Sequence, residues 1–157
     1  MKQIVVVADM KVGKAGDVLV THALGSCLGL IVHDPGTKIG GLLHAMLPLS
    51  KVNRQKAAAN PFMFVDTGVP ELFKHLYDMG GNKNRFVVKL AGCSTPLGEN
   101  QMFKIGERNF VVVKKLLMKN KIPISSEAIG GTFSRTVHFN ISTGEVYITT
   151  SGKKSVI

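Results

Sequence analysis

The sequence has no tryptophan, only two cysteines and only ten acidic residues among its 157. It also has no run of about 18 or more apolar residues, so we expect no transmembrane helix. The apolar stretch at residues 4–8, which follows Met1 and Lys2, is too short for a secretory signal. The two cysteines, Cys27 and Cys93, lie far apart and form no CxxC motif. These absences predict a cytoplasmic protein.

The scarcity of acidic residues leaves the chain strongly basic. Twenty Lys and Arg against ten Asp and Glu give a formal net charge of +10 at pH 7. Such a charge favours an acidic partner, which means nucleic acid, an anionic membrane or an acidic protein. The basic residues are scattered, with few aromatic residues beside them for base stacking, so nucleic-acid binding rests on charge alone. The length predicts one domain over residues 1–157.

Short extended segments dominate the first third of the chain. They are β-branched or Leu-rich and are separated by glycine-bearing breaks, which predicts strands over residues 4–8, 17–21, 28–33 and 38–47. The basic stretch from Ser50 to Asn60 has no clear amphipathic period, so we expect a surface loop there.

Two helices are expected in the rest of the chain. Apolar residues at helical spacing predict one helix with Thr67 as its N-cap, ending at Gly80 and Gly81, and a second one over residues 110–120. Further strands are predicted over residues 85–91, 122–129, 137–141 and 146–150, the last two forming a hairpin. The expected fold class is α+β, with mixed or antiparallel sheets packed with two main helices in a layered α/β sandwich and many strands in the N-terminal third.

A hairpin turn at residues 34–37 (Asp-Pro-Gly-Thr) brings two candidate catalytic residues together. If the loop is centred between Pro35 and Gly36, the residues of the two strands pair symmetrically about this centre. Cys27 then lies directly opposite His44. Directly opposite residues of an antiparallel pair have Cβ atoms about 4.5–5.5 Å apart on the same face. The sequence therefore predicts a thiol–imidazole pair, provided that no bulge interrupts the ladder.

Such a pair suits nucleophilic catalysis. The thiolate is the nucleophile, and a neighbouring imidazole accepts the thiol proton and holds a counter-charge. Gly25 and Ser26 precede Cys27, and their backbone N–H groups are candidates for an oxyanion and substrate pocket. Thr21, at the end of the preceding strand, is the candidate to accept the second imidazole N–H and to fix the tautomer. The glycines at positions 29, 40 and 41 are expected to leave room for substrate.

Two other interpretations of these residues stay open. A free cysteine is often a small buried hydrophobic residue, as we expect for Cys93, and a histidine on a strand is often a core residue whose hydrogen bonds are satisfied. Metal binding would use His22, His33, His44 and Cys27, although the sequence has no CxxC or HxxxH spacing.

Several motifs together resemble the CheD family, the chemoreceptor glutamine deamidases of bacterial and archaeal chemotaxis, nearly end to end. These are Leu24-Gly25-Ser26-Cys27, Asp34-Pro35, the run Gly-Leu-Leu-His-Ala-Met-Leu-Pro at 41–48, Ile-Gly-Glu-Arg-Asn at 105–109, Gly130-Gly131, Arg135 and Thr143-Gly144.

The resemblance implies a Cys-His type protein-glutamine glutaminase. Selected glutamines on the cytoplasmic helices of chemoreceptors would become glutamates, with Cys27 as nucleophile, His44 as base and Thr21 as its orienting residue. It implies no metal and no organic cofactor. It also implies a partner, the CheC phosphatase of the response regulator, which occupies the substrate surface of the deamidase.

The chain departs from the family pattern between residues 92 and 103. It has Ala91-Gly92-Cys93-Ser94 where the family usually shows Gly-Gly-Ala, and Met102-Phe103 follows only after a longer segment. The second hypothesis is therefore a non-catalytic or weakly catalytic regulator that binds the CheC phosphatase.

Overall fold

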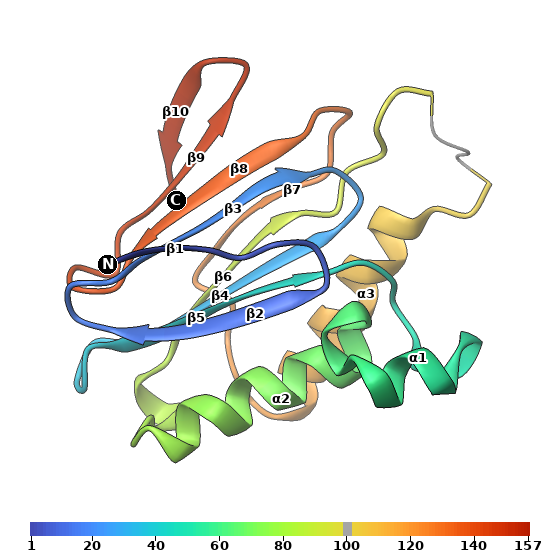
Figure 1. Ribbon diagram of the computed structural model, residues 1–157. Coiled ribbons are helices and arrows are strands. Elements are labelled where there is room, and N and C mark those ends of the chain that lie inside the picture. The colour runs from blue at the N-terminus through green and yellow to red at the C-terminus, as the bar shows by residue number, and fades with distance from the viewer. Residues whose placement is uncertain (99–101) are drawn as a thin grey trace.

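The protein is described here by a computed structural model that covers residues 1–98 and 102–157 (Figure 1). The segment between Cys93 and Met102, in which the sequence departs from the family pattern, lies partly outside these residues. The strands are β1 (Lys2–Ile4), β2 (Asp9–Lys14), β3 (Val18–Leu24), β4 (Leu28–Asp34), β5 (Ile39–Ala45), β6 (Val87–Gly92), β7 (Ser126–Ile129), β8 (Arg135–Asn140), β9 (Val146–Thr150) and β10 (Lys153–Val156). The helices are α1 (Arg54–Ala59), α2 (Val65–Asp78) and α3 (Ile105–Lys119), with single 3₁₀ turns at Ser50–Val52, Pro61–Met63 and Lys83–Arg85.

The described strands form two five-stranded sheets. One sheet has the order β1-β3-β8-β9-β10 and the other has the order β2-β5-β4-β6-β7. The β1–β3 and β6–β7 pairs are parallel, and the remaining pairs are antiparallel. In Figure 1 the two sheets lie face to face, and α2 and α3 cover the outer face of the second sheet. This arrangement confirms the predicted α+β class with two main helices.

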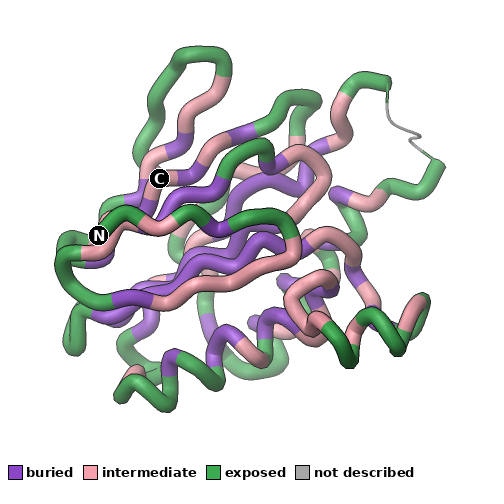
Figure 2. The backbone as a smooth tube through the Cα atoms, in the orientation of Figure 1, coloured by how far each residue is buried: buried purple, intermediate pink, exposed green. Residues whose placement is uncertain are grey.

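Strands β4 and β5 occupy the middle layer, and every residue of both is buried (Figure 2). Their side chains alternate between two cores. Leu30 and Leu43 pack toward the helices, whereas Ile31 and Leu42 pack toward the other sheet. A side chain on these strands therefore faces either the helices or the space between the sheets, which decides where a catalytic residue can lie.

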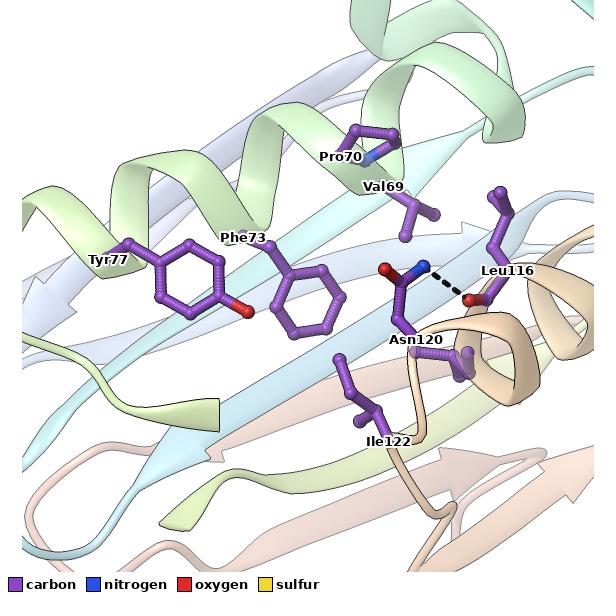
Figure 3. Close-up of a pocket in the computed structure, with 8 residues that line it drawn as sticks. Val69, Pro70, Phe73, Tyr77, Leu116, Asn120 and Ile122 are labelled. Atoms are coloured by element: carbon purple, nitrogen blue, oxygen red, sulfur yellow. Dashed lines mark hydrogen bonds between the residues drawn. The ribbon is translucent and has the colours of Figure 1, made fainter. Parts of the chain in front are cut away.

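The two main helices pack against each other as well as against the sheet. A pocket of about 200 Å³ lies between them and is lined mainly by apolar side chains, among them Phe73, Tyr77 and Ile122 (Figure 3). Helix α3 ends beside it, where the Asn120 Nδ2 donates to the Leu116 carbonyl at 2.8 Å. Among the residues that the structure describes, no helix is long and apolar enough to cross a membrane.

The β4–β5 hairpin has a different register from the one predicted. Asp34 pairs with Ile39, so the loop is centred between Gly36 and Thr37, and His44 lies opposite Gly29 rather than Cys27. The residue with positive φ is Lys38, at 55°, and not Gly36. The predicted register is therefore wrong by two residues.

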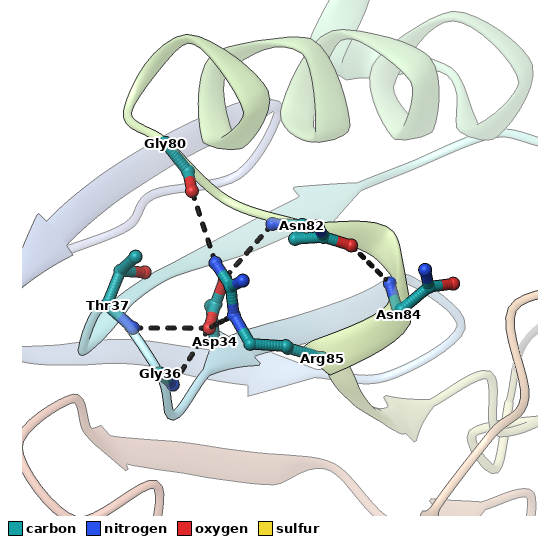
Figure 4. A network of polar contacts seen from close by, with 7 residues as sticks. All are labelled: Asp34, Gly36, Thr37, Gly80, Asn82, Asn84 and Arg85. Atoms are coloured by element: carbon teal, nitrogen blue, oxygen red, sulfur yellow. Dashed lines mark hydrogen bonds and ion pairs between the residues drawn. The ribbon is translucent and has the colours of Figure 1, made fainter.

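Long-range contacts of Asp34 hold this loop in place (Figure 4). Its carboxylate accepts hydrogen bonds from the Gly36 and Thr37 backbone N–H groups, from the Asn82 N–H and from both Nε and Nη2 of Arg85. Burial alone would raise the pKa of Asp34, but the Arg85 guanidinium and these N–H groups outweigh it and hold the pKa well below its usual range. The loop geometry is thus set by residues about fifty positions away, which the local turn motif does not reveal.

Three other expectations about the elements are wrong. Strands β2 and β10 were not expected, and the segment from Ser50 to Asn60 is not a loop but contains α1, whose N-cap Asn53 accepts from the Lys56 N–H. Helix α2 begins two residues before Thr67, whose hydroxyl instead donates to the Pro61 carbonyl. A capping contact of Asn53 begins α1 although its residues lack an amphipathic period, and a tertiary contact of Thr67 replaces the expected cap of α2.

Candidate active site

His44 lies at the end of β5 and faces the space between the two sheets. It shares the face of Leu42, which packs against the other sheet, and it is fully buried. Its Nδ1 lies 2.7 Å from the Thr21 hydroxyl, which β3 of the opposite sheet contributes. The structure therefore brings together the predicted base and its predicted orienting residue across the sandwich.

The contacts of Thr21 define the tautomer of His44. The Thr21 hydroxyl also lies 2.6 Å from the Val5 carbonyl oxygen, which can only accept. Because the hydroxyl has one proton, it donates to Val5, and it accepts the Nδ1–H of His44. The neutral imidazole then has its lone pair on Nε2, and this atom is buried without a hydrogen-bond partner in the described part of the chain. Nε2 is therefore positioned to take a proton.

Burial controls the protonation of this imidazole. Desolvation lowers the pKa of His44 to about 4, because the charged form loses its hydration in the space between the sheets. His44 is thus neutral at pH 7, as a general base must be.

Cys27 comes immediately before β4 and is partly exposed. Its side chain packs against the core between the sheets, on the face that His44 shares. Because His44 lies opposite Gly29, Cys27 is its diagonal neighbour two residues along β4. The register error of two residues preserved the face, so Cys27 and His44 lie on the same side of the sheet, and their association stays a prediction.

Three consecutive carbonyls fix the segment that carries Cys27. The Gly25 carbonyl accepts from the Ser94 N–H at 2.9 Å, and the Cys27 carbonyl accepts from the Cys93 N–H at 2.8 Å. The Ser26 carbonyl accepts from Nδ2 of Asn109 at 2.9 Å. Two of the donors directly follow β6 and the third comes from α3, so these two parts of the chain hold the segment in place.

The two residues predicted to form an oxyanion pocket differ in their backbone N–H groups. The Gly25 N–H donates to the Ala23 carbonyl at 3.0 Å, so it is already engaged. The Ser26 N–H has no acceptor within the described ranges. Of the two, only Ser26 offers a backbone donor beside the nucleophile.

Asn109 is a residue of this site for which the sequence analysis predicted no role. It is fully buried in the second turn of α3, and its Nδ2 donates to the carbonyls of Ser26 and Met46, at 2.9 and 3.0 Å. These carbonyls belong to the segments that carry Cys27 and His44. The contacts span 83 and 63 residues, so no local pattern reveals them; only the family-like run at 105–109 marks the position.

The glycines expected to leave room for substrate instead accommodate core side chains. A Cβ added at Gly40 would lie 2.6 Å from Cζ of Phe139, and one at Gly41 would lie 2.5 Å from Cδ1 of Leu72. At Gly29 the neighbour is Cδ1 of Leu24, at 2.7 Å. Glycine occupies these positions because the sheets and helices pack too closely there for a larger residue.

The alternative metal ligands are not brought together. His33 contacts the Ile141 carbonyl at 2.8 Å, His22 is exposed on β3, and His44 is bonded to Thr21. Among the described residues no group of three or more His, Cys, Asp or Glu is placed to hold a metal ion.

The pocket of Figure 3 is lined by the C-terminal part of α3, whereas Asn109 contacts the Cys27 segment from the N-terminal part of the same helix. This pocket is therefore not the candidate site.

Comparisons with known proteins give the family. A family model described as "CheD chemotactic sensory transduction" matches residues 46–150. The chain is 43% identical over 150 residues to "Probable chemoreceptor glutamine deamidase CheD 1" of Syntrophus aciditrophicus, covering 95% of this chain and 94% of that protein. The chain belongs to the CheD family.

Other CheD relatives cover nearly the whole chain as well. "Probable chemoreceptor glutamine deamidase CheD" of Solibacter usitatus is 43% identical over 156 residues, with 98% of this chain and 92% of that protein covered. "Probable chemoreceptor glutamine deamidase CheD 2" of Anaeromyxobacter dehalogenans is 39% identical over 143 residues, with 90% of each chain covered. The family model begins after His44, but the two longest of these alignments include the segment from Thr21 to His44.

Proposed function

We propose that this CheD protein is a chemoreceptor glutamine deamidase, which hydrolyses the side-chain amides of selected glutamines to glutamates in the cytoplasm. The relatives carry this activity in their names. The observation that carries the proposal is the hydrogen bond between Thr21 and His44, which leaves Nε2 as a buried acceptor on the face shared with Cys27. A thiol beside such a base is the arrangement that acyl transfer requires.

The first half of the reaction forms a thioester. Nε2 of His44 accepts the thiol proton while Sγ of Cys27 attacks the amide carbon, and the carbonyl oxygen becomes an oxyanion that the Ser26 N–H can stabilise. The resulting imidazolium then donates its proton to the amide nitrogen. The C–N bond breaks, ammonia leaves, and the acyl group stays on sulfur.

The second half returns the enzyme to its starting state. His44 takes a proton from a water molecule, and the hydroxide attacks the thioester carbon. The C–S bond breaks, the proton on His44 returns to sulfur, and the substrate side chain leaves as a carboxylic acid, which loses its remaining proton to the solvent. Thr21 contributes by accepting the Nδ1–H throughout, which keeps the lone pair on Nε2.

A groove along α3 supports binding of a helical protein substrate. It is about 420 Å³, and its lining includes Phe103, Arg108, Val111 and Lys115 at the start and along one face of α3. Phe103 is 59% exposed and Val111 is 46% exposed. Asn109 of the same helix contacts the Cys27 segment, so a receptor helix bound here would present its glutamines near the thiol. The groove is lined by three basic residues, Lys104, Arg108 and Lys115, and one acidic residue, Glu107, and this excess of positive charge favours an acidic helix.

The deciding experiment compares the wild type with Cys27→Ala on glutamine-bearing receptor cytoplasmic fragments. Mass spectrometry scores the conversion of amide to acid, and ammonia is measured in parallel. We expect conversion by the wild type alone. The variant removes the thiol without adding volume, so its circular dichroism and melting temperature should match the wild type. Ammonia release by Cys27→Ala would contradict the assigned nucleophile.

The exposed apolar side chains of Phe103, just before α3, and Val111, in the first half of α3, also favour a second function, binding of a CheC-type phosphatase. Clusters of this kind on a soluble surface commonly mark protein interfaces. Val111→Glu should weaken this binding, whereas Met118→Glu, at a more exposed position near the other end of α3, serves as the control. If neither the wild type nor Cys27→Ala deamidates a receptor, but Val111→Glu abolishes phosphatase binding, the regulator hypothesis is favoured.

A further inference from the structure

Arg135 is a buried cation with no counter-ion among the residues that the structure describes. It is the first residue of β8, it faces the space between the sheets, and only 7% of it is exposed. Its Nη1 lies 3.3 Å from the Gly92 carbonyl, and its guanidinium lies 4.6 Å from the centre of the Phe133 ring. No carboxylate among the described residues lies within ion-pairing distance of it.

These contacts do not neutralise the guanidinium. The Gly92 carbonyl already accepts from the Gly130 N–H at 3.0 Å, and its bond to Arg135 is long. Burial accordingly lowers the pKa of Arg135, with only the neighbouring Cys93 acting in the other direction. A buried charge is costly unless it is paired, so Arg135 is a position where an anionic ligand would relieve an existing penalty.

The guanidinium also lines a hollow whose other groups suit an anion. The hollow is about 450 Å³ and lies between β7, the start of β8 and the β9–β10 hairpin. Besides Arg135 and Phe133, its lining includes the polar residues Thr150, Ser151, Lys153 and Ser155, and no acidic residue. Two cations and three hydroxyls can together bind a carboxylate, and the planar guanidinium can do so through two parallel hydrogen bonds.

The hollow lies on the opposite side of Cys27 from His44. The strand order β5-β4-β6-β7 places the segment of Cys27, which leads into β4, between His44 on β5 and the β6 carbonyl that Arg135 contacts. Gly92, which provides that carbonyl, pairs with Leu28, the residue after Cys27. A peptide that crosses the nucleophile toward β6 and β7 would therefore bring one of its neighbouring side chains to the guanidinium.

We propose that Arg135, with Lys153 and the hydroxyls of the β9–β10 hairpin, forms a subsite for a carboxylate of the protein substrate. This subsite selects glutamines that have an acidic side chain nearby, and it rests on the proposed deamidase function. Because each deamidation creates a carboxylate, a glutamate formed at one position becomes a ligand that favours reaction at a neighbouring glutamine.

The test measures binding separately from turnover. Two labelled helical peptides carry one central glutamine, flanked one turn away on each side by glutamate in one peptide and by alanine in the other. Fluorescence anisotropy with Cys27→Ala, which lacks the nucleophile, should give tighter binding of the acidic peptide by about tenfold or more at low salt, and the preference should shrink as salt is added. Equal affinities for the two peptides would overturn the proposal.

Substitutions test which residues produce the tighter binding of the acidic peptide. In the Cys27→Ala background, Arg135→Gln should remove the preference, and Arg135→Lys should restore part of it, because lysine keeps the charge but not the fork of donors. Arg54→Gln is the control, since this arginine is exposed on α1 and has no ion pair among the residues described. If Arg135→Gln does not fold, Lys153→Ala at the exposed end of the hollow should reduce the preference about two- to fivefold. A preference retained in the folded variants overturns the subsite.

Kinetic measurements distinguish the proposed carboxylate subsite from the proposed deamidation reaction. The wild type should deamidate the acidic peptide with the higher kcat/KM, and Arg135→Gln should lose this difference between the two peptides. If binding discriminates but neither peptide is deamidated, the subsite stands and the proposed reaction fails. If Arg135→Gln lowers both rates equally, Arg135 has a purely structural role.

Discussion

The Thr21 hydroxyl and Nδ1 of His44 lie 2.7 Å apart, although the two residues belong to different sheets. Their hydrogen bond crosses the space between the sheets, where both side chains are fully buried. Because the hydroxyl proton is directed to the Val5 carbonyl, the interaction selects one tautomer and one ring orientation of His44. The packing of the two sheets therefore determines which imidazole nitrogen carries the proton and which keeps its lone pair.

Replacing Thr21 should separate this effect from simple packing. Thr21→Val keeps the shape but removes the acceptor for Nδ1–H, so kcat/KM for deamidation should fall by about 10- to 100-fold, as for other residues that orient a catalytic histidine. Thr21→Ser should restore most of the activity. Thr67→Val is the matched control, because the Thr67 hydroxyl also donates to a backbone carbonyl but lies on α2. Full activity in Thr21→Val would show that the tautomer is set by other means.

The hairpin illustrates how far local sequence reaches. Pro35 and Gly36 correctly predict a turn, but they suggest the wrong centre, because Asp34 is anchored by Asn82 and Arg85 from a distant part of the chain. The error of two residues left Cys27 and His44 on one face, since side chains alternate with a period of two. An error of one residue would have placed them on opposite faces.

The stability of the protein should depend on pH through His44. Its pKa is about 4 in the folded protein and about 6.5 in an unfolded chain, so between these values the unfolded chain binds more protons. The stabilisation is fully present above pH 6.5 and is lost as the pH falls through 4. Its limit is roughly 3 kcal/mol. Urea unfolding as a function of pH should show this loss.

Two variants assign that loss to His44. His44→Gln should flatten the dependence of the unfolding free energy on pH over this window, whereas His22→Gln, at an exposed position on β3, should leave it unchanged. His33 also has a pKa lowered by burial, so some slope should persist in His44→Gln. An identical slope in His44→Gln and the wild type would contradict the neutral, desolvated imidazole.

The two cysteines should differ sharply in reactivity. Burial raises the pKa of Cys93 to about 12, so at pH 8 only about one Cys93 thiol in ten thousand is ionised. Cys27 is partly exposed beside a neutral imidazole. Iodoacetamide should therefore label Cys27 alone in the native protein and both thiols in denaturant, as peptide mass spectrometry can show. Labelling of native Cys93 would contradict its inert assignment, and Cys93→Ser provides the control for single-site labelling.

The residues that the sequence analysis left without a role act over long distances. Asn109 and Arg135 reach the nucleophile region through contacts that span 83 and 43 residues. An asparagine in an amphipathic helix and an arginine at the start of a strand have no local signature of such roles. The proposed catalytic residues could be singled out because a thiol, an imidazole and a hydroxyl have distinctive chemistry, whereas Asn109 and Arg135 are common residue types whose long-range contacts leave no local pattern.

Asn109 offers a direct test of positioning. Asn109→Ala leaves the Ser26 and Met46 carbonyls without this donor, which should cost about 2–4 kcal/mol of unfolding free energy. Because Nδ2 links the Cys27 segment to the residue two positions after His44, kcat should fall more than the folded fraction does, and the alkylation rate of Cys27 should change. Asn120→Ala is the matched control, since it removes one amide-to-carbonyl bond at the other end of α3. Reduced stability with an unchanged Cys27 alkylation rate and unchanged kcat would limit Asn109 to a structural role.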